Sequence, residues 1–298
     1  MIENTENSKM NNLLYLMLFF IALEGFFFVT QTNKYDNDFR QNQIKLERIQ
    51  NILKGTPIIA KAYSVYDIND NIIIYSKNGD IKMPLASLVK IMSISLALNN
   101  HKDNKEVIIS KNAINQVGDF GMYANEKWNI EDLAKFTLIS SANDGAYAML
   151  ENDVNYLEKI NSKAKRLGMK EAVFLNSTGL DFDNNTASAF ATAEDVNIMA
   201  IYAFRAYPLI FSSTILPEMT LKSKSGFIHN IKNTNTIIDK IPNLIFSKTG
   251  YTTLAGGNLT IIFKDKVGHN IAITILGSTY HGRFTDIEKL VNVLELSY

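Results

Sequence analysis

Segments with the pattern of strands lie at both ends of one long region of the chain, and this order restricts the fold. Residues 58–67 and 71–76 are rich in β-branched side chains, and the turn signal Asn78-Gly79 follows them, which predicts two strands. Further strand-like runs come late in the sequence, at residues 237–238, 244–246, 259–263 and 271–276. Strands from the two ends of a domain can pair in one antiparallel sheet.

The residues between these strands have helical patterns. The segment 88–98 is apolar nearly all round, which is typical of a buried helix. Other helical stretches cover residues 130–151, with a polar break at 140–145, and residues 156–167, 193–207 and about 286–296. The predicted class is therefore α+β: an antiparallel sheet of N- and C-terminal strands, helices on its faces, and a helical lobe from the middle of the chain.

Composition narrows the functions that the chain can have. With 298 residues, 46% of them hydrophobic, the chain can build a sizeable core in one large or two small domains. Its 30 basic and 30 acidic residues balance, so no general attraction to nucleic acid is expected. The sequence contains no cysteine, which excludes disulfides, thiolate nucleophiles and cysteine metal sites.

The N-terminus contains a strongly apolar segment. Residues 13–29 are almost wholly apolar over 17 positions, the short end of what spans a bilayer, and Glu24 within them is costly in lipid. We interpret residues 13–30 as an uncleaved membrane anchor; a cleaved signal peptide and a buried core helix are the alternatives. The basic residues on its two sides slightly oppose export, so charge leaves the orientation open.

The domain organisation follows from this segment. We expect a short polar tail at residues 1–12, the anchor at 13–30, a stalk at 31–55 that ends at Gly55, and one folded domain at 56–298.

The first chemical motif is Ser87-Leu-Val-Lys90, at the start of the predicted buried helix. Residues three apart on a helix share a face, so the lysine amine is expected beside the serine hydroxyl. A serine is a weak nucleophile until a base takes its proton, and a lysine is such a base only when its pKa is lowered. The helix N-terminus also offers backbone N–H groups to a developing oxyanion.

Two further motifs follow in the chain. Ser141-Ala-Asn143 lies in the polar break, where a hydroxyl can relay a proton and an amide can hold a peptide group. Lys248-Thr249-Gly250 offers a cation and a hydroxyl to a carboxylate, and its glycine allows close backbone approach. Each motif alone is a weak signal, because short triplets also occur on solvated loops and helix faces.

Competing copies of the motifs show how weak each signal is by itself. The chain has a second S-x-x-K at Ser162, further S-x-N triplets at Ser76 and Ser110, and a second K-S-G at Lys224. Ser162 lies in a charged helical segment and Lys224 lies among polar residues, so Ser162 is expected to be exposed. The apolar neighbours of a desolvated site occur only around Ser87, Ser141 and Lys248, which favours these three.

Other catalytic arrangements find little support. The histidines are scattered in polar contexts and no G-x-S-x-G motif occurs, so a Ser-His-Asp triad is not favoured. Without H-E-x-x-H or cysteine, neither a metal site nor a cofactor is expected. Asp144 and Asp195 are interpreted as helix caps or surface residues.

Longer strings around the motifs resemble segments of the D-Ala-D-Ala carboxypeptidases, in the same order. The strings are MPLASLVKIM, ISSANDGAYAML, FLNSTGLDF, ATAEDVNIMA, NTNTII and FSKTGYTTLAGGNLTI, and the resemblance covers residues 56–297. It implies a fold of the β-lactamase and DD-peptidase type and a serine DD-peptidase domain at residues 56–298. The middle motif, Ser-Ala-Asn, departs from S-D-N and is closer to the carboxypeptidase form.

This resemblance implies a role for each motif residue. Ser87 would form the acyl-enzyme, Lys90 would take its proton, Ser141 would pass a proton to the leaving amine, and Asn143 would bind the substrate amide. The implied substrate is a peptidoglycan stem peptide that ends in D-Ala-D-Ala, with β-lactams as covalent inhibitors and no cofactor.

The third motif would bind the substrate's end. Lys248 and Thr249 would hold the terminal carboxylate, and Gly250 would let the substrate approach the backbone. The N–H groups of Ser87 and Tyr251 would form the oxyanion hole. Lys248 would also help to lower the pKa of Lys90.

Three related functions stay open at this stage. A serine β-lactamase uses the same motifs, although the glutamate and asparagine of its deacylation loop are four apart and Glu171 and Asn176 here are five apart. An endopeptidase or transpeptidase shares the same chemistry. A non-catalytic sensor of penicillin or peptide could also have this fold. The favoured interpretation is a membrane-anchored carboxypeptidase on the extracytoplasmic side, next to the cell wall.

Overall fold

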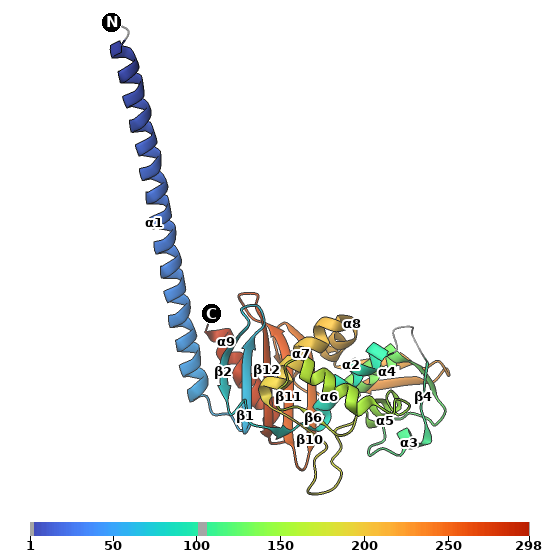
Figure 1. Cartoon of the computed structure of the whole chain (residues 1–298). Helices are drawn as coiled ribbons and strands as arrows, with labels where there is room; N and C mark the ends of the chain where they lie inside the picture. The colour runs from blue at the N-terminus through green and yellow to red at the C-terminus, as the bar shows by residue number, and fades with distance from the viewer. Residues whose placement is uncertain (1–2, 101–105, 298) are drawn as a thin grey trace. The chain divides into compact units, whose positions relative to one another are not determined.

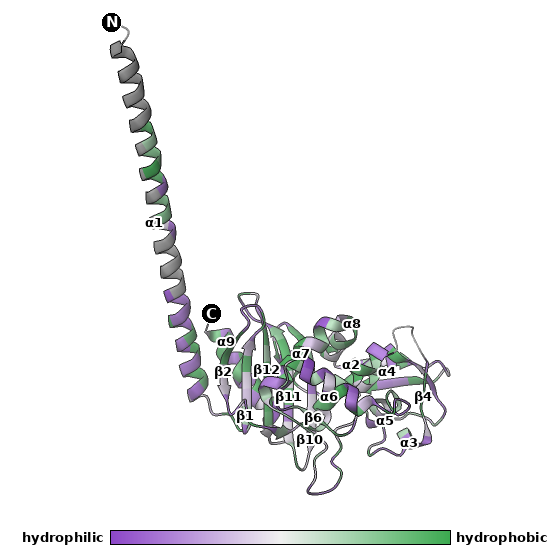
Figure 2. Cartoon of the chain, viewed as in Figure 1, coloured by the Kyte–Doolittle hydropathy of each residue, from purple (hydrophilic) through white to green (hydrophobic). Residues whose placement is uncertain are grey.

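The protein is described here by a computed structural model that covers residues 3–100 and 106–297. The chain forms two compact units, Met1–Asn51 and Ile52–Tyr298. In the first unit the described residues belong to one long helix, α1 (Glu3–Gly55). A green band in Figure 2 marks the apolar turns of this helix, whose exposed large side chains are Leu16, Met17, Phe19, Phe20, Ile21, Leu23, Phe26, Phe27 and Phe28.

A length and hydropathy test for membrane spans gives a limited result. Within the described ranges, no single helix is long and apolar enough to pass it, and the apolar stretch Phe19–Phe28 of α1 is shorter than required. The helices Ala193–Ala206 and Pro208–Ile215, bent by 111° relative to each other, pass it only as a pair.

The second unit is built on a five-stranded antiparallel sheet with the order β10-β11-β12-β1-β2. Its strands are β1 (Ala62–Asp67), β2 (Ile72–Lys77), β10 (Leu244–Thr252), β11 (Gly256–Lys264) and β12 (Asn270–Ser278). β1 pairs with β12 from Ala62 opposite Leu276 to Asp67 opposite Ile271. The predicted α+β sheet of N- and C-terminal strands is therefore confirmed (Figure 1).

Helices cover both faces of this sheet. Side chains alternate along a strand, so Thr274 of β12 faces one side and Ile273 and Ile275 face the other. On the first side, the Thr274 hydroxyl donates a 2.7 Å hydrogen bond to Asn197 Oδ1 of α7 (Ala193–Ala206). On the second side, the fully buried isoleucines lie under the apolar residues of α9 (Gly282–Leu296), such as Leu290.

A buried carboxylate in α9 fixes the entry of the chain into the sheet. Asp286 is fully buried and accepts hydrogen bonds from the backbone amides of Ile59 and Ala60, at 2.9 and 2.8 Å, and from Ser278 Oγ at 2.7 Å. Buried charge is tolerated where hydrogen bonds satisfy it. These three donors hold the segment before β1 against α9 and the end of β12.

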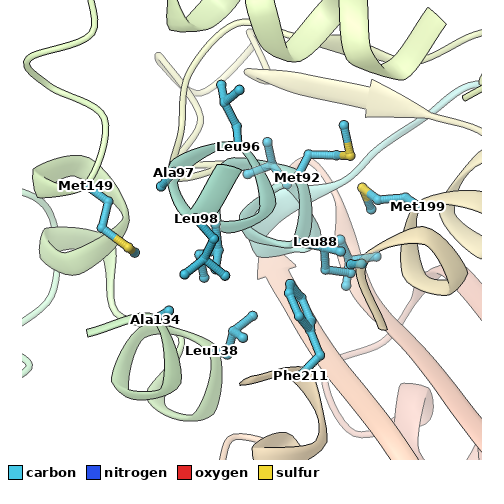
Figure 3. Packing of buried hydrophobic residues seen from close by; sticks show 14 of the residues in the cluster. Leu88, Met92, Leu96, Ala97, Leu98, Ala134, Leu138, Met149, Met199 and Phe211 are labelled. Carbon is cyan, nitrogen blue, oxygen red and sulfur yellow. The ribbon is translucent and has the colours of Figure 1, made fainter. Parts of the chain in front are cut away.

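The helical lobe packs around one buried helix. The turn of 3₁₀ helix η1 (Ala86–Val89) leads into α2 (Lys90–Asn100), and every residue of α2 up to Leu98 is buried, as its all-round apolar pattern predicted. Figure 3 shows Leu88 and Met92 beside Met199 of α7 and Phe211 of α8 (Pro208–Phe211). The lobe is completed by α4 (Ile130–Ser140), α5 (Asn143–Ala148) and α6 (Tyr156–Arg166).

Smaller elements surround this frame. They are α3 (Lys111–Ile114), η2 (Ser212–Ile215), η3 (Ile238–Lys240), β3 (Met83–Pro84), β4 (Glu106–Ile108), β5 (Lys127–Asn129), β6 (Val173–Phe174), β7 (Ala189–Ala191), β8 (Glu218–Lys222) and β9 (Ile228–Lys232).

Two sequence expectations about strands differ from the structure. The strand predicted at residues 237–238 is wrong, because Ile237 and Ile238 are buried in a turn that opens η3. The hairpin of β8 and β9 had no counterpart in the prediction. Both cases are short segments, where an apolar pair or a polar alternation does not separate strand from turn.

Candidate active site

The serine and lysine of the first motif lie at the start of the buried helix. Ser87 is half-buried in η1, and Lys90, the first residue of α2, is fully buried. Lys90 Nζ lies 2.7 Å from Ser87 Oγ, 2.7 Å from Asn143 Oδ1 and 2.6 Å from the carbonyl oxygen of Thr178. The three acceptors match the three N–H donors of an ammonium group, and a neutral amine in the same place can accept the Ser87 proton.

Burial gives Lys90 the protonation behaviour of a base. Loss of hydration lowers the pKa of Lys90 to about 7, and the nearby carboxylate of Asp144 acts in the opposite direction. A large share of the amine is therefore neutral near pH 7. This is the property that a lysine needs to activate a serine hydroxyl.

A sharp turn presents Ser87 to the site. Ala86, just before it, has a positive φ of 49°. A Cβ placed on Gly179 would lie 2.0 Å from the Ala86 carbonyl oxygen, and one on Gly250 would lie 2.8 Å from the Leu85 carbonyl oxygen. Only glycine fits at these two positions, so the turn is held closely between β10 and the loop after β6.

The end of α4 brings the second motif to the same place. Ser141 has a positive φ of 61° and ends α4, and Asn143 begins α5 two residues later. The Asn143 amide is fixed at both ends, since its oxygen accepts from Lys90 and its Nδ2 donates to the Val117 carbonyl oxygen at 2.7 Å. The predicted break in the helical pattern is thus a tight turn that directs both side chains into the site.

The third motif lies on β10. Lys248 Nζ donates to Ser141 Oγ and to the Thr249 carbonyl oxygen, both at 2.9 Å. The Thr249 hydroxyl is 2.6 Å from the hydroxyl of Thr234. Lys90 binds Ser87 and Asn143, and Lys248 binds Ser141 of the same motif as Asn143, so the two lysines bring all three motifs together. Below, the Ser87 group means Ser87, Lys90, Ser141, Asn143 and Lys248.

The site carries an excess of buried positive charge. Burial, then the charges of Lys90 and Arg283, lower the pKa of Lys248 well below its usual value. Burial is the largest cause of the lowered pKa of both lysines, and the two cations also repel each other. That Lys248 helps to lower the pKa of Lys90 stays a prediction. An anionic group bound here would relieve that repulsion.

Gly250 and Tyr251 complete the segment. The Gly250 carbonyl oxygen accepts a 2.8 Å hydrogen bond from Nη1 of the buried Arg283. A Cβ on Gly250 would lie 3.3 Å from the Ser87 amide nitrogen, so β10 runs next to the nucleophile. Tyr251 is 48% exposed, and its ring meets that of Tyr280 edge to face with centroids 5.0 Å apart.

Comparison with known proteins identifies the kind of site. Residues 50–279 match the family model for D-alanyl-D-alanine carboxypeptidases. The chain belongs to this family. It is 29% identical to a D-alanyl-D-alanine endopeptidase of Pseudomonas aeruginosa over 245 residues, which are 78% of this chain and 76% of that protein. It is 28% identical to the D-alanyl-D-alanine carboxypeptidase DacF of Bacillus subtilis over 243 residues, 78% of this chain and 61% of DacF.

A solved structure agrees with the family assignment. Penicillin-binding protein D2 of Listeria monocytogenes in its ampicillin-bound form superposes with a TM-score of 0.67 and 27% identity, over 80% of this chain and 98% of that one. The predicted family, the DD-peptidase-like α+β fold and the serine hydrolase class are therefore confirmed. Members of the carboxypeptidase family act on the cell wall, which agrees with an extracytoplasmic domain.

Several contacts in this carboxypeptidase site were absent from the sequence prediction. The carbonyl groups of Val117 and Thr178, the hydroxyl of Thr234 and the guanidinium of Arg283 all touch motif residues. The strings FLNSTGLDF and NTNTII, which resemble the family, contain Thr178 and Thr234 and were a usable signal. The other two contacts involve residues with no local pattern to mark them.

The competing motif copies have structural roles outside the site. Ser76 Oγ donates to Glu194, and Ser110 is the N-cap of α3. Lys224 lies 3.8 Å from Glu106 in an exposed ion pair. Ser162 belongs to α6 and is half-buried, so the prediction that it is exposed is wrong: the facing side chains of α2 and α7 partly cover it.

The two acidic residues interpreted as caps or surface residues differ from each other. Asp195 completes a capping box with Thr192 at the start of α7, which confirms a cap. Asp144 is buried, and burial raises its pKa to about 6. It lies in the first turn of α5, where its carboxylate accepts from the Gly145 amide and acts on Lys90.

Proposed function

We propose that this protein is a serine D-alanyl-D-alanine carboxypeptidase that removes the terminal D-alanine of peptidoglycan stem peptides through an acyl-enzyme on Ser87. The observation that supports this most strongly is the geometry of the Ser87 group. The fully buried Lys90 is hydrogen-bonded to Ser87 and Asn143, and the buried Lys248 is hydrogen-bonded to Ser141. This arrangement provides a nucleophile, a base with a lowered pKa and a cationic end, which together suit a peptide with a free carboxylate.

Acylation follows from the positions of these groups. The neutral amine of Lys90 takes the proton of Ser87, whose oxygen attacks the carbonyl carbon between the two D-alanines. Ser141 passes a proton to the leaving amine and is itself resupplied through Lys248, 2.9 Å away. The C–N bond breaks, D-alanine leaves, and the acyl group stays on Ser87. Water then hydrolyses the ester and restores the serine.

The remaining motif residues fit a role in substrate binding. The carboxylate of the terminal D-alanine would lie against Lys248 and Thr249, where the positive charges of the buried Lys248 and Arg283 favour an anion. Asn143 would bind the substrate amide. Backbone N–H groups of Ser87 and Tyr251 would hold the oxyanion, a contribution of about 3–4 kcal/mol per donor in other acyl-transfer enzymes. Gly250 leaves space for this approach.

The size of the substrate is the least constrained part of the proposal. The matched relatives are named endopeptidase or carboxypeptidase at nearly equal identity, 29% and 28%. Both activities hydrolyse a peptide bond to D-alanine with the same catalytic group. The positive charges of Lys248 and Arg283 favour a substrate with a free carboxylate, so the carboxypeptidase activity is proposed first.

We also propose that residues 13–30 anchor the protein in the cell membrane, with residues 1–12 as a short tail, 31–55 as a stalk and the catalytic domain at 56–298 outside the cytoplasm. The support is the run of exposed apolar side chains on α1, including Phe26, Phe27 and Phe28. Apolar surface of this kind is stable in lipid or against another protein. An anchor would keep the domain next to its cell-wall substrate.

The test uses the full chain in detergent micelles with benzylpenicillin, followed by intact mass over time. A stable adduct of one penicillin is expected, and Ser87→Ala should abolish it. Ser162→Ala is the matched control, because Ser162 belongs to the other S-x-x-K sequence and should keep the adduct. Release of D-alanine from a peptide that ends in D-Ala-D-Ala, and cleavage of a cross-linked dimer, are measured in parallel.

Each outcome has a definite meaning. An adduct with D-alanine release supports the carboxypeptidase, and cleavage of the cross-linked dimer alone supports the endopeptidase. Fast penicillin hydrolysis without an adduct would indicate a β-lactamase. An adduct without peptide turnover would indicate a sensor. A folded protein that forms no adduct and releases no D-alanine would refute the mechanism.

A further inference from the structure

Two turns that are far apart in the sequence meet at one corner of the sheet. The turn after β1 carries Asp67 and Asp70, and the turn between β11 and β12 carries Asp265 and His269. Asp67 pairs with Ile271 across the strands, so the two turns are neighbours. This corner lies where the end of β1 is opposite the start of β12, around residues 67 and 271. The third motif lies elsewhere in the sheet, on β10, where Lys248 is opposite Thr260 of β11. None of these four residues contributes to the site around Ser87.

Three side chains at this corner converge as metal ligands do. Asp67, Asp70 and His269 each offer one ligand atom, and these atoms all lie within 4.8 Å of one another. His269 Nδ1 is 2.7 Å from Asp67 Oδ2 and 3.8 Å from Asp70 Oδ2. Donor atoms that share an ion at about 2.0–2.2 Å are roughly 3–4 Å apart, so small side-chain movements would suffice.

A fourth carboxylate at the corner is buried with one oxygen unused. Asp265 is 3% exposed; its Oδ1 accepts from the amides of Val267 and His269, at 3.0 and 2.8 Å. Its Oδ2 is buried and has no hydrogen-bond partner among the described residues, and the same holds for Oδ1 of Asn270. Asp265 is not one of the three converging residues, but a cation bound beside it would offset part of the cost of its buried, unpaired oxygen.

The charges around the imidazole agree with this geometry. Carboxylate oxygens of Asp67 and Asp70 lie 2.7 and 3.8 Å from His269 Nδ1, and Asp265 accepts a hydrogen bond from the His269 amide. Three carboxylates therefore surround one ring. So many acidic groups around one imidazole make a local excess of negative charge that a divalent ion would neutralise.

We propose that this corner binds a divalent transition-metal ion of the zinc class through Asp67, Asp70 and His269. An imidazole nitrogen in the ligand set favours zinc or a neighbouring first-row metal over calcium and magnesium, which prefer oxygen alone. Binding requires His269 to release the proton on Nδ1 to solvent or to carry it on Nε2 instead. The ion would join the end of β1 and the turn after it to the turn between β11 and β12. It would therefore stabilise the pairing of β1 with β12.

This inference departs from the sequence-based expectation that the chain has no metal site. That expectation rested on the absence of local motifs, whereas His269 and Asp67 are 202 positions apart. It is independent of the proposed peptidase activity, because none of the three ligands belongs to the Ser87 group.

The test measures thermal unfolding of the full chain in detergent, after chelation and dialysis, with zinc chloride alone and with manganese, calcium or magnesium chloride. An ion at one hundred times its dissociation constant should raise the midpoint by about 5–10 °C for a domain of this size. Zinc should give the largest shift. Asp70→Asn and His269→Gln should lose it; Asp70 is 58% exposed, so its change leaves the fold intact.

Matched controls separate this site from other acidic or histidine groups. Asp239→Asn and His281→Gln make the same chemical changes at exposed positions and should keep the full zinc shift. Formation of the penicillin adduct on Ser87 shows that each variant is folded, and it reports on the peptidase proposal separately. The metal proposal is overturned if zinc and manganese produce no shift, or if Asp70→Asn and His269→Gln shift as much as the unchanged chain.

Discussion

The chemistry of this protein depends on how one lysine is buried. Lys90 has no exposed surface, and its Nζ is surrounded by Ser87 Oγ, Asn143 Oδ1 and the Thr178 carbonyl oxygen. Burial lowers its pKa to about 7, and Asp144 limits that decrease. A lysine on the surface would stay charged at neutral pH and could not take a proton from serine.

The protonation of Lys90 predicts the pH profile of acylation. Because the neutral amine is the reactive form, the rate of penicillin acylation should rise as pH rises through about 7 and then level off. Asp144→Asn removes the charge that raises the pKa of Lys90, so the midpoint should move to lower pH. Stopped-flow acylation between pH 5.5 and 9 measures both.

The control for this prediction is Asp239→Asn, an exposed acidic residue far along the sequence from the motif. Its midpoint should equal that of the unchanged chain. A rate that is flat across the range, or a midpoint that moves upward in Asp144→Asn, would contradict the role given to Lys90.

At the scale of elements, the β8–β9 hairpin is held by a buried contact between a histidine and a glutamate. His229 Nε2 of β9 lies 2.7 Å from Glu126 Oε1, and both side chains are at least 93% buried. The rings of Trp128 and Phe136 pack around the imidazole, with centroids 5.1 and 5.6 Å away. The chain that leaves this hairpin carries Thr234 to Thr249, so the pair also supports the candidate site.

Removing one partner of this pair should be costly. Glu126→Ala or His229→Ala leaves a buried polar group without its partner, and each should lower the free energy of unfolding by about 3–5 kcal/mol. Replacing both with leucine should cost clearly less than the sum of the single changes. Denaturant unfolding measures all of these variants.

An exposed pair provides the comparison. The carboxylate of Glu288 lies 3.0 Å from Lys240 Nζ. Changing Glu288 to alanine should lower the free energy of unfolding by only about 0–1 kcal/mol. Equal losses at Glu126 and Glu288 would show that burial of the hairpin pair adds nothing to stability.

At the scale of the whole molecule, the chain combines a catalytic unit with a helix that has a different composition. The unit Ile52–Tyr298 has its own core, whereas α1 exposes phenylalanine and leucine side chains along its apolar turns. Exposed apolar surface of this extent is unfavourable in water. We therefore expect these turns to be buried in the membrane in the cell.

Cell fractionation tests the proposed anchor. The full chain should sediment with membranes and resist extraction at alkaline pH, and protease added to spheroplasts should digest the catalytic domain. Changing Phe26, Phe27 and Phe28 to serine should release much of the protein, because each change removes buried apolar surface. Changing Gln41, Asn42 and Gln43 to serine, in the expected stalk, is the control and should have no effect.

The size of the protein distinguishes an anchor from a signal peptide. An uncleaved chain has a mass of 33.5 kDa, and a shorter product in the soluble fraction would indicate cleavage. Full-length protein that stays soluble would contradict the anchor, and protection from external protease would contradict its outward orientation.

Local sequence was enough to predict features that depend on near neighbours. The helix that follows Ser87 and begins at Lys90, the break before Asn143 and the helix that begins at Ala193 all come from periodicity within a few residues. The serine–lysine contact is of this kind, since the two residues are three positions apart. Family resemblance then indicated which motif copies matter.

Contacts between distant segments required the folded structure. The Thr178 carbonyl accepts a hydrogen bond from Lys90, the Thr234 hydroxyl contacts that of Thr249, and His269 contacts Asp67 at the proposed metal site. Such contacts arise from strand pairing and packing between parts of the chain whose separation no local pattern records. Periodicity predicts which face of an element is buried, but only tertiary packing decides what lies against it.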